Sequence, residues 1–230
     1  FTAVTVPCLL ILGLVMADLI NRHTYGGSAI RVMIFIPYIA SVVAVCTVWQ
    51  VMLQPSYGPI NEFLRTIGIE NPPKWLVDEH WALIAIMLIN IWSQVGYYVA
   101  VYMSGLKNVP ADLYEAAQID GANRMNRMKY ITLPALANTI ITVFILNLAK
   151  VMNLFESVFV LQSPITYAKS QVLQTYVYTK TFSGGNSDYG YTTAVGLFKS
   201  FVGMILVLGC NWASKKTRGR GIVSVSYTHL

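Results

Sequence analysis

The chain has 230 residues, of which 55% are hydrophobic and only 11% are charged; its formal net charge is +6 and its mean hydropathy is +0.55. A soluble domain usually carries about 25% charged residues, so this chain has too few charges to solvate the surface of a soluble protein. The composition also excludes disorder, collagen and a disulfide scaffold, which leaves a polytopic membrane protein.

Five apolar stretches are long enough to cross a membrane as helices. A spanning helix needs about 20 mostly apolar residues, and these runs are too continuous for the alternating strands of a membrane barrel. Lys150 and Glu156 interrupt the fourth stretch, and Lys199 interrupts the fifth. We therefore predict an all-α membrane protein with spans at 1–17, 32–53, 82–106, 135–162 and 189–214.

The basic residues determine the orientation of these spans. Ten of the 16 Lys and Arg residues fall in residues 20–31, residues 107–134 and the tail, whereas four fall in the opposite connections. Loops rich in Lys and Arg stay in the cytoplasm. We therefore predict a multi-pass protein of a bacterial-type plasma (inner) membrane with a cytoplasmic C-terminus. The odd number of spans fits a chain that lacks its first helix.

The longest cytoplasmic loop, residues 107–134, has the features of a short helix followed by a turn. Pro110 suits a first helical turn, and Asp112 favours the positive end of a helix dipole. Gly121 suits a left-handed stop, and Pro134 opens the next span. On physical grounds this segment is either a connecting loop with a surface helix or an element that docks on a partner. A second polar helix is expected after Gly121.

The same loop carries a motif with fixed spacing. Glu115-Ala116-Ala117, three residues, Gly121, nine residues and then Ile131-Thr132-Leu133-Pro134 resemble the complete EAA loop of membrane permeases of binding-protein-dependent ABC importers. The segments at 35–38, 57–61, 75–76, 153–161, 175–178 and 194–198 are similar to the carbohydrate-uptake branch of that family, closest to permeases for plant-polysaccharide-derived oligosaccharides.

The resemblance implies a fold and a division of the chain. The fold is the type I ABC importer transmembrane domain, with five of its six helices present. Residues 1–214 form the permease domain, with the coupling loop at 107–134, and residues 215–230 form a cytoplasmic tail. The last five residues, 226–230, resemble translated sequencing-adapter sequence and are interpreted as non-native.

The resemblance also implies a function and partners. The chain would be one of two permease subunits and would receive an oligosaccharide from an extracytoplasmic solute-binding protein. It would also couple to a cytoplasmic ATPase dimer. The coupling residues would be Glu115, Ala116, Ala117 and Gly121, with Ile131, Leu133 and Pro134 completing the motif. No G-x4-G-K-[ST] motif is present, so ATP and Mg²⁺ belong to the partner ATPase and the chain itself is not an enzyme.

Other functional classes fit the sequence less well. The three cysteines and three histidines are scattered, so we expect neither a metal site nor a bound cofactor. The net positive charge belongs to the membrane orientation, and we expect the bilayer rather than nucleic acid as its partner. An intramembrane hydrolase lacks a nucleophile and base placed together. An ion-coupled secondary transporter remains the alternative function.

Polar residues within the spans are candidates for the substrate path. Intramembrane polar groups usually face the protein interior or a water-filled path, and sugars suit amides, charges and aromatic rings. An acidic sugar such as a galacturonide would give Lys150 a counter-ion. Alternatively, Lys150 pairs with Glu156 or snorkels, Glu156 lies at the outer surface, and the polar residues of span 82–106 form interhelical hydrogen bonds. The candidates are Asn147, Lys150, Asn153, Glu156, Trp92, Gln94 and Tyr97.

Overall fold

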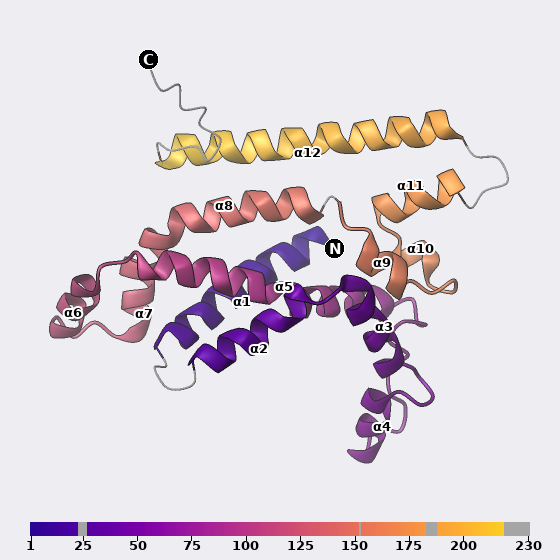
Figure 1. Ribbon diagram of the computed structural model, residues 1–230, viewed down its shortest axis with the longest axis horizontal. Coiled ribbons are helices and arrows are strands. Elements are labelled where there is room, and N and C mark those ends of the chain that lie inside the picture. Colours follow the sequence, from indigo (N-terminus) through magenta and orange to yellow (C-terminus); the bar gives the residue numbers. More distant parts are fainter. Residues whose placement is uncertain (23–26, 152, 183–187, 219–230) are drawn as a thin grey trace.

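The computed structural model describes residues 1–22, 27–151, 153–182 and 188–218, and within these ranges it contains helices and no strand. The helices, shown in Figure 1, are α1 (Thr2–Arg22), α2 (Gly27–Ile39), α3 (Val42–Met52), α4 (Pro59–Thr66), α5 (Ala82–Lys107), α6 (Ala111–Ile119), α7 (Arg124–Arg127), the π-helix η1 (Met128–Thr132), α8 (Leu133–Val151), α9 (Glu156–Leu161), α10 (Tyr167–Ser170), α11 (Leu173–Phe182) and α12 (Tyr189–Arg218).

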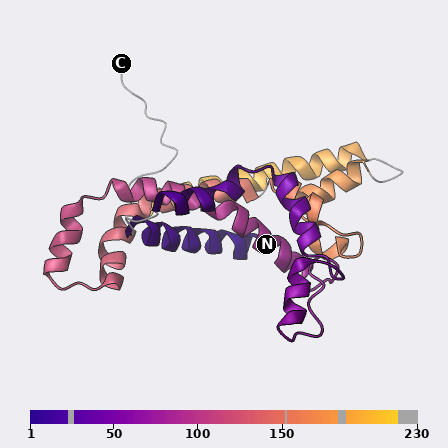
Figure 2. The same ribbon diagram turned by 60° about the horizontal axis from the view of Figure 1, so that its bottom comes forward.

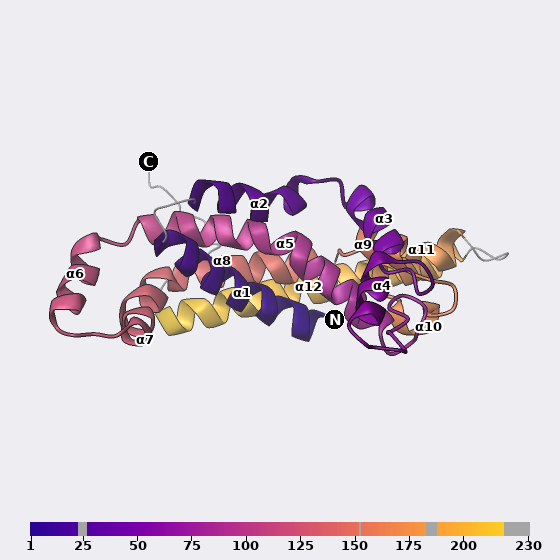
Figure 3. The same cartoon turned by 90° about the horizontal axis from the view of Figure 1, so that it is seen from below.

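The long helices lie along one axis of the molecule (Figures 1 and 3). Four segments of the described chain, including α7, η1 and α8 together, are long and apolar enough to cross a membrane, and the bent pair α2 and α3 brings the number to five. This agrees with the five predicted spans. Helix α5 is central, because it packs against α1, α2, α8, α9 and α10.

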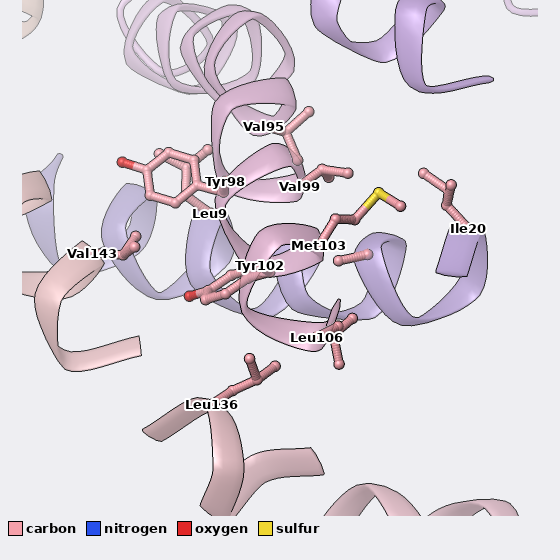
Figure 4. Packing of buried hydrophobic residues seen from close by; sticks show 11 residues of the cluster. Leu9, Ile20, Val95, Tyr98, Val99, Tyr102, Met103, Leu106, Leu136 and Val143 are labelled. Carbon is pink, nitrogen blue, oxygen red and sulfur yellow. The ribbon is translucent and has the colours of Figure 1, made fainter. Parts of the chain in front are cut away.

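A stripe along α5 forms the main hydrophobic core. Val95, Tyr98, Tyr102 and Leu106 of α5 are buried, and Figure 4 shows that Tyr98 and Tyr102 lie among side chains of α1 and α8. Their spacing of three or four residues places them on one face of the helix. Helix α1 approaches closely at Gly13, where an added Cβ would lie 2.6 Å from the Tyr98 Cβ.

The second predicted span is a bent pair of helices rather than one rod. Helices α2 and α3 meet at an angle of 96°. Pro37 lies within α2, where it removes a backbone donor and its ring clashes with the preceding turn. The chain therefore leaves the helix after Ile39 and restarts at Val42.

The prediction of one helix through 135–162 is wrong, because α8 ends at Val151 and a separate helix, α9, begins at Glu156. The Asn153 side-chain amide donates to the Ala149 carbonyl at 3.1 Å, and its backbone N–H donates to the Lys150 carbonyl at 3.0 Å. These bonds satisfy carbonyls that a continuing helix would use, so the polar side chain favours the end of the helix.

Candidate substrate path and coupling loop

A cavity of about 240 Å³, lined by both polar and apolar side chains, lies where the bent pair, α5 and the end of α8 meet. Its wall includes Pro37 and Tyr38 beside the bend, Asn90, Ser93 and Gln94 of α5, and residues 153–157 of the segment that joins α8 to α9. The two helix breaks described above thus open this cavity. Lys150, in the last turn of α8, provides its amine to the same wall.

Lys150 is held by neutral groups from α2 and α5. Its Nζ donates to Gln94 Oε1 at 2.7 Å and lies 5.2 Å from the ring centroid of Tyr38 and 5.8 Å from that of Tyr97. Gln94 and Tyr97 are three residues apart and share one face of α5. The amine therefore lies against an amide oxygen and two aromatic rings, in the geometry of cation–π contacts.

A second lysine is linked to the same region. Lys199 Nζ, from α12, donates to Asn153 Oδ1 at 2.9 Å and to Gln174 Oε1 at 2.6 Å. Asn153 also lines the cavity that Lys150 lines, so its hydrogen bond connects Lys199 to the cavity wall. Gln174 lies in α11 and was not predicted, since no spacing in the sequence relates it to Lys199.

Neither lysine has an acidic partner among the described residues. The ion pairs of the described chain join other residues, and Glu156 lies on the cavity wall without an ion pair to Lys150. The expected alternative of a Lys150–Glu156 pair is therefore absent from this part of the structure. Both amines therefore donate to neutral amide oxygens rather than to carboxylates.

The remaining path candidates lie elsewhere. Asn147 is 3% exposed and does not line the cavity, and its Nδ2 finds no partner among the described residues. The predicted arc of Asn147, Lys150 and Asn153 does not share one helix, because Asn147 and Lys150 lie in α8 whereas Asn153 follows its end. Trp92 packs edge-on against Trp49 with ring centroids 5.3 Å apart and lines a separate apolar cavity of about 320 Å³.

Helix α6, which contains the Glu115-Ala116-Ala117 segment, projects from one end of the molecule (Figure 2). None of its residues is buried, and Glu115 and Ala116 are exposed. Asp112 lies in its first turn, as predicted. Among the described residues α6 is not packed into a core, which leaves its motif available to another protein.

Gly121 ends α6 in the left-handed conformation that the sequence predicted, with φ of +73°. The Ala122 N–H donates to the Ala117 carbonyl at 2.9 Å, and the Gly121 N–H donates to the Gln118 carbonyl at 3.1 Å. This pair of bonds is the Schellman motif, which satisfies the last carbonyls of a helix. The motif glycine therefore sets the direction in which the chain leaves α6.

Two side-chain contacts hold the loop in place. Tyr114 Oη of α6 is 3.0 Å from Thr132 Oγ1, and Arg124 Nη2 of α7 is 3.3 Å from Oδ2 of Asp18, a buried carboxylate of α1. The π-helix η1 includes Ile131, and α8 begins at Leu133. A wider π turn accommodates Pro134, whose ring would clash with an α-helical carbonyl.

Comparisons with known proteins agree with this arrangement. The model of the family described as "Binding-protein-dependent transport system inner membrane component" matches residues 10–219. Protein LplB of Bacillus subtilis is 34% identical over 94% of this chain and 67% of its own length. The polygalacturonan/rhamnogalacturonan transport system permease protein YteP of the same organism is 34% identical over 96% of this chain and 67% of its own length. A chain in the structure of a bacterial alginate ABC transporter, in complex with alginate pentasaccharide-bound periplasmic protein, matches with a TM-score of 0.87 and 28% identity, over 96% of this chain and 78% of that chain.

Proposed function

This chain belongs to the family of binding-protein-dependent transport system inner membrane components, and on that premise we propose that it forms part of the path by which an oligosaccharide enters the cell. It is the permease subunit of an ABC importer, and the ion-coupled secondary transporter finds no support among its relatives. A second permease subunit completes the path.

The cavity supports an oligosaccharide as the substrate. Its wall carries the amides of Gln94 and Asn153, the hydroxyl of Ser93 and the amphipathic ring of Tyr38, and each of these oxygens can accept a further hydrogen bond. Sugar hydroxyls need partners of this kind. Relatives whose names state a substrate include permeases for polygalacturonan/rhamnogalacturonan, trehalose/maltose, diacetylchitobiose and lactose, and a solved relative belongs to an alginate transporter, so saccharides are the transported class among them.

The two lysines favour a saccharide that carries carboxylates. Lys150 and Lys199 hold amide oxygens and no acidic group among the described residues, so each has an unneutralised charge. The carboxylate of a uronic acid unit would pair with these amines during transport. This pairing would offset the free-energy cost of placing a charged amine within the membrane protein.

The coupling loop supports a separate ATPase as the source of energy. Helix α6 buries none of its residues and carries the motif residues Glu115 and Ala116 on its exposed surface. We assign this helix to a cleft on a cytoplasmic ATPase dimer, which binds ATP and Mg²⁺. An extracytoplasmic solute-binding protein delivers the sugar to the opposite end. The assignment requires α6 and the C-terminus to be cytoplasmic, in agreement with the positive charge of those segments.

Uptake competition in cells that express the complete importer tests the proposal. Unlabelled neutral oligosaccharides, uronic oligosaccharides, peptides and amino acids compete with the labelled cognate sugar, for wild type and for Lys150→Met. Lys180→Met, at the exposed outer end of α11, is the matched control. We expect oligosaccharides alone to compete, and we expect Lys150→Met to lower uptake of uronic sugars selectively.

The outcomes separate the three parts of the proposal. Competition by peptides with none by oligosaccharides would refute the substrate class. Equal loss of neutral and uronic uptake in Lys150→Met would leave an oligosaccharide path but refute the charge role of the lysine. Uptake that follows an ion gradient after ATP depletion would refute coupling to an ATPase.

A further inference from the structure

A second groove, separate from the substrate path, lies between α2 and α5. It measures about 300 Å³, and Val32, Phe35, Val99, Ala100 and Met103 give it an apolar lining. Val99 and Met103 form a buried floor, whereas Val32 and Ala100 are exposed on the surface of the bundle. Figure 3 shows α2 beside α5 along this length. The groove therefore faces the surroundings of the protein rather than its interior.

Two cations lie at one end of this groove. Arg31, in the second turn of α2, and Lys107, the last residue of α5, both belong to its lining and are exposed. Neither side chain forms an ion pair within the part of the chain that the structure describes. The groove thus combines an apolar surface with two positive charges at one end.

The opposite end is closed by the two helices themselves. An added Cβ at Gly96 would lie 2.3 Å from the Ile34 carbonyl oxygen, so the backbones of α5 and α2 meet there. Lys107 follows Gly96 by 11 residues, which correspond to about 16 Å of helix at ~1.5 Å per residue. That length is close to half of the ~30 Å hydrocarbon core, the depth of a single leaflet.

We propose that this groove binds a phospholipid with an anionic headgroup. The phosphate contacts Arg31 and Lys107, and one acyl chain lies over Val99 and Met103 with its end near Gly96. Guanidinium groups bind phosphate through paired hydrogen bonds, and basic pockets between membrane helices are typical sites for anionic lipids. In the orientation proposed above the lipid belongs to the cytoplasmic leaflet, and the site does not depend on the transported sugar.

Charge complementarity favours a lipid over a helix of the second permease subunit as the occupant. An apolar helix would cover the floor of the groove but would need an acidic group at the level of Arg31 and Lys107. A phospholipid provides the apolar chain and the negative charge in one molecule, at the separation that the groove requires. The second subunit is therefore an outcome that the experiment must distinguish.

Native mass spectrometry of the purified complete importer tests this site. The complex is exchanged into micelles that contain phosphatidylglycerol or phosphatidylcholine, and retained lipid is counted for wild type and for Arg31→Gln/Lys107→Gln. Lys215→Gln/Lys216→Gln, near the end of α12, removes the same charge outside the groove. We expect wild type and this control to retain phosphatidylglycerol preferentially. Retention in the groove variant should fall roughly 10- to 30-fold, the effect of two basic groups beside anionic headgroups.

A second variant tests the apolar part of the site. Ala100→Trp fills the groove and leaves both cations in place, so it should also lose the lipid if the acyl chain lies there. A photo-reactive residue at Ala100 should crosslink to lipid. Equal retention of both lipids, equal effects of the groove and control variants, or a crosslink to the second permease subunit would each overturn the proposal.

Discussion

Replacing Gly121 by valine should uncouple ATP hydrolysis from sugar uptake without affecting insertion into the membrane. Gly121 adopts φ of +73°, and an added Cβ would meet nothing within 4 Å. The substitution therefore causes no steric clash with the rest of the chain. Its cost arises from the backbone alone, because a Cβ disfavours the left-handed conformation and a branched side chain disfavours it further.

The size of the effect follows from this conformational cost. A left-handed L-residue costs about 1–2 kcal/mol, which changes the population of the native turn by roughly 5- to 30-fold. Helix α6 has nine residues and none of them is buried, so little tertiary packing opposes the change. If the ATPase binds α6 only in its native direction, uptake per ATP hydrolysed should fall by up to the same factor.

The assay measures ATP hydrolysis and sugar uptake on one preparation of proteoliposomes that contain the complete importer. Gly68 is the matched control, since its φ is +97° and an added Cβ there also meets nothing, but it lies after α4 in the predicted outer loop. Gly68→Val should keep normal coupling. Gly121→Asn should retain most of the coupling, because asparagine tolerates the left-handed region.

Normal uptake per ATP in Gly121→Val would show that the direction of the chain after α6 does not control coupling. Equal damage from Gly68→Val would show that the loss reflects general instability instead. Protease protection of the inserted variants separates both outcomes from failed insertion.

Three further predictions concern topology and packing. A reporter fused after Ser214 should be active only in the cytoplasm, and activity only outside the cell would contradict the predicted orientation. Gly96→Ala should lower the free energy of unfolding by about 1–3 kcal/mol, because the added Cβ would meet the Ile34 backbone. Gly105→Ala should cost less, because its Cβ would lie 2.6 Å from Cδ2 of Leu136, the end of a side chain that can move. Equal melting temperatures of the two variants would contradict this difference. Asp18→Ala should free Arg124 and speed amide exchange in α7, and unchanged exchange would show that the ion pair does not hold the loop.

The number of membrane spans and the helix and turn around Gly121 could be predicted from the sequence because both depend on neighbouring residues, whereas the bend between α2 and α3 and the end of α8 at Val151 could not. A continuous apolar run specifies a span wherever it occurs, since every backbone polar group must be satisfied within the helix. The end of α6 at Gly121 is equally local, because only glycine adopts the required backbone conformation at little cost. The motif and its geometry therefore agree.

The surroundings of the candidate path residues depended on the tertiary structure. Hydropathy did not show that Asn153 ends α8, because an amide within an apolar run is compatible with either a helix interior or a helix end. The contacts of Lys150 with Gln94 and of Lys199 with Gln174 join residues 56 and 25 positions apart, and only the packing of α5, α8, α11 and α12 brings them together. A sequence specifies which side chains carry charge, but the helix crossings decide which neutral groups surround them and where an unneutralised amine is left.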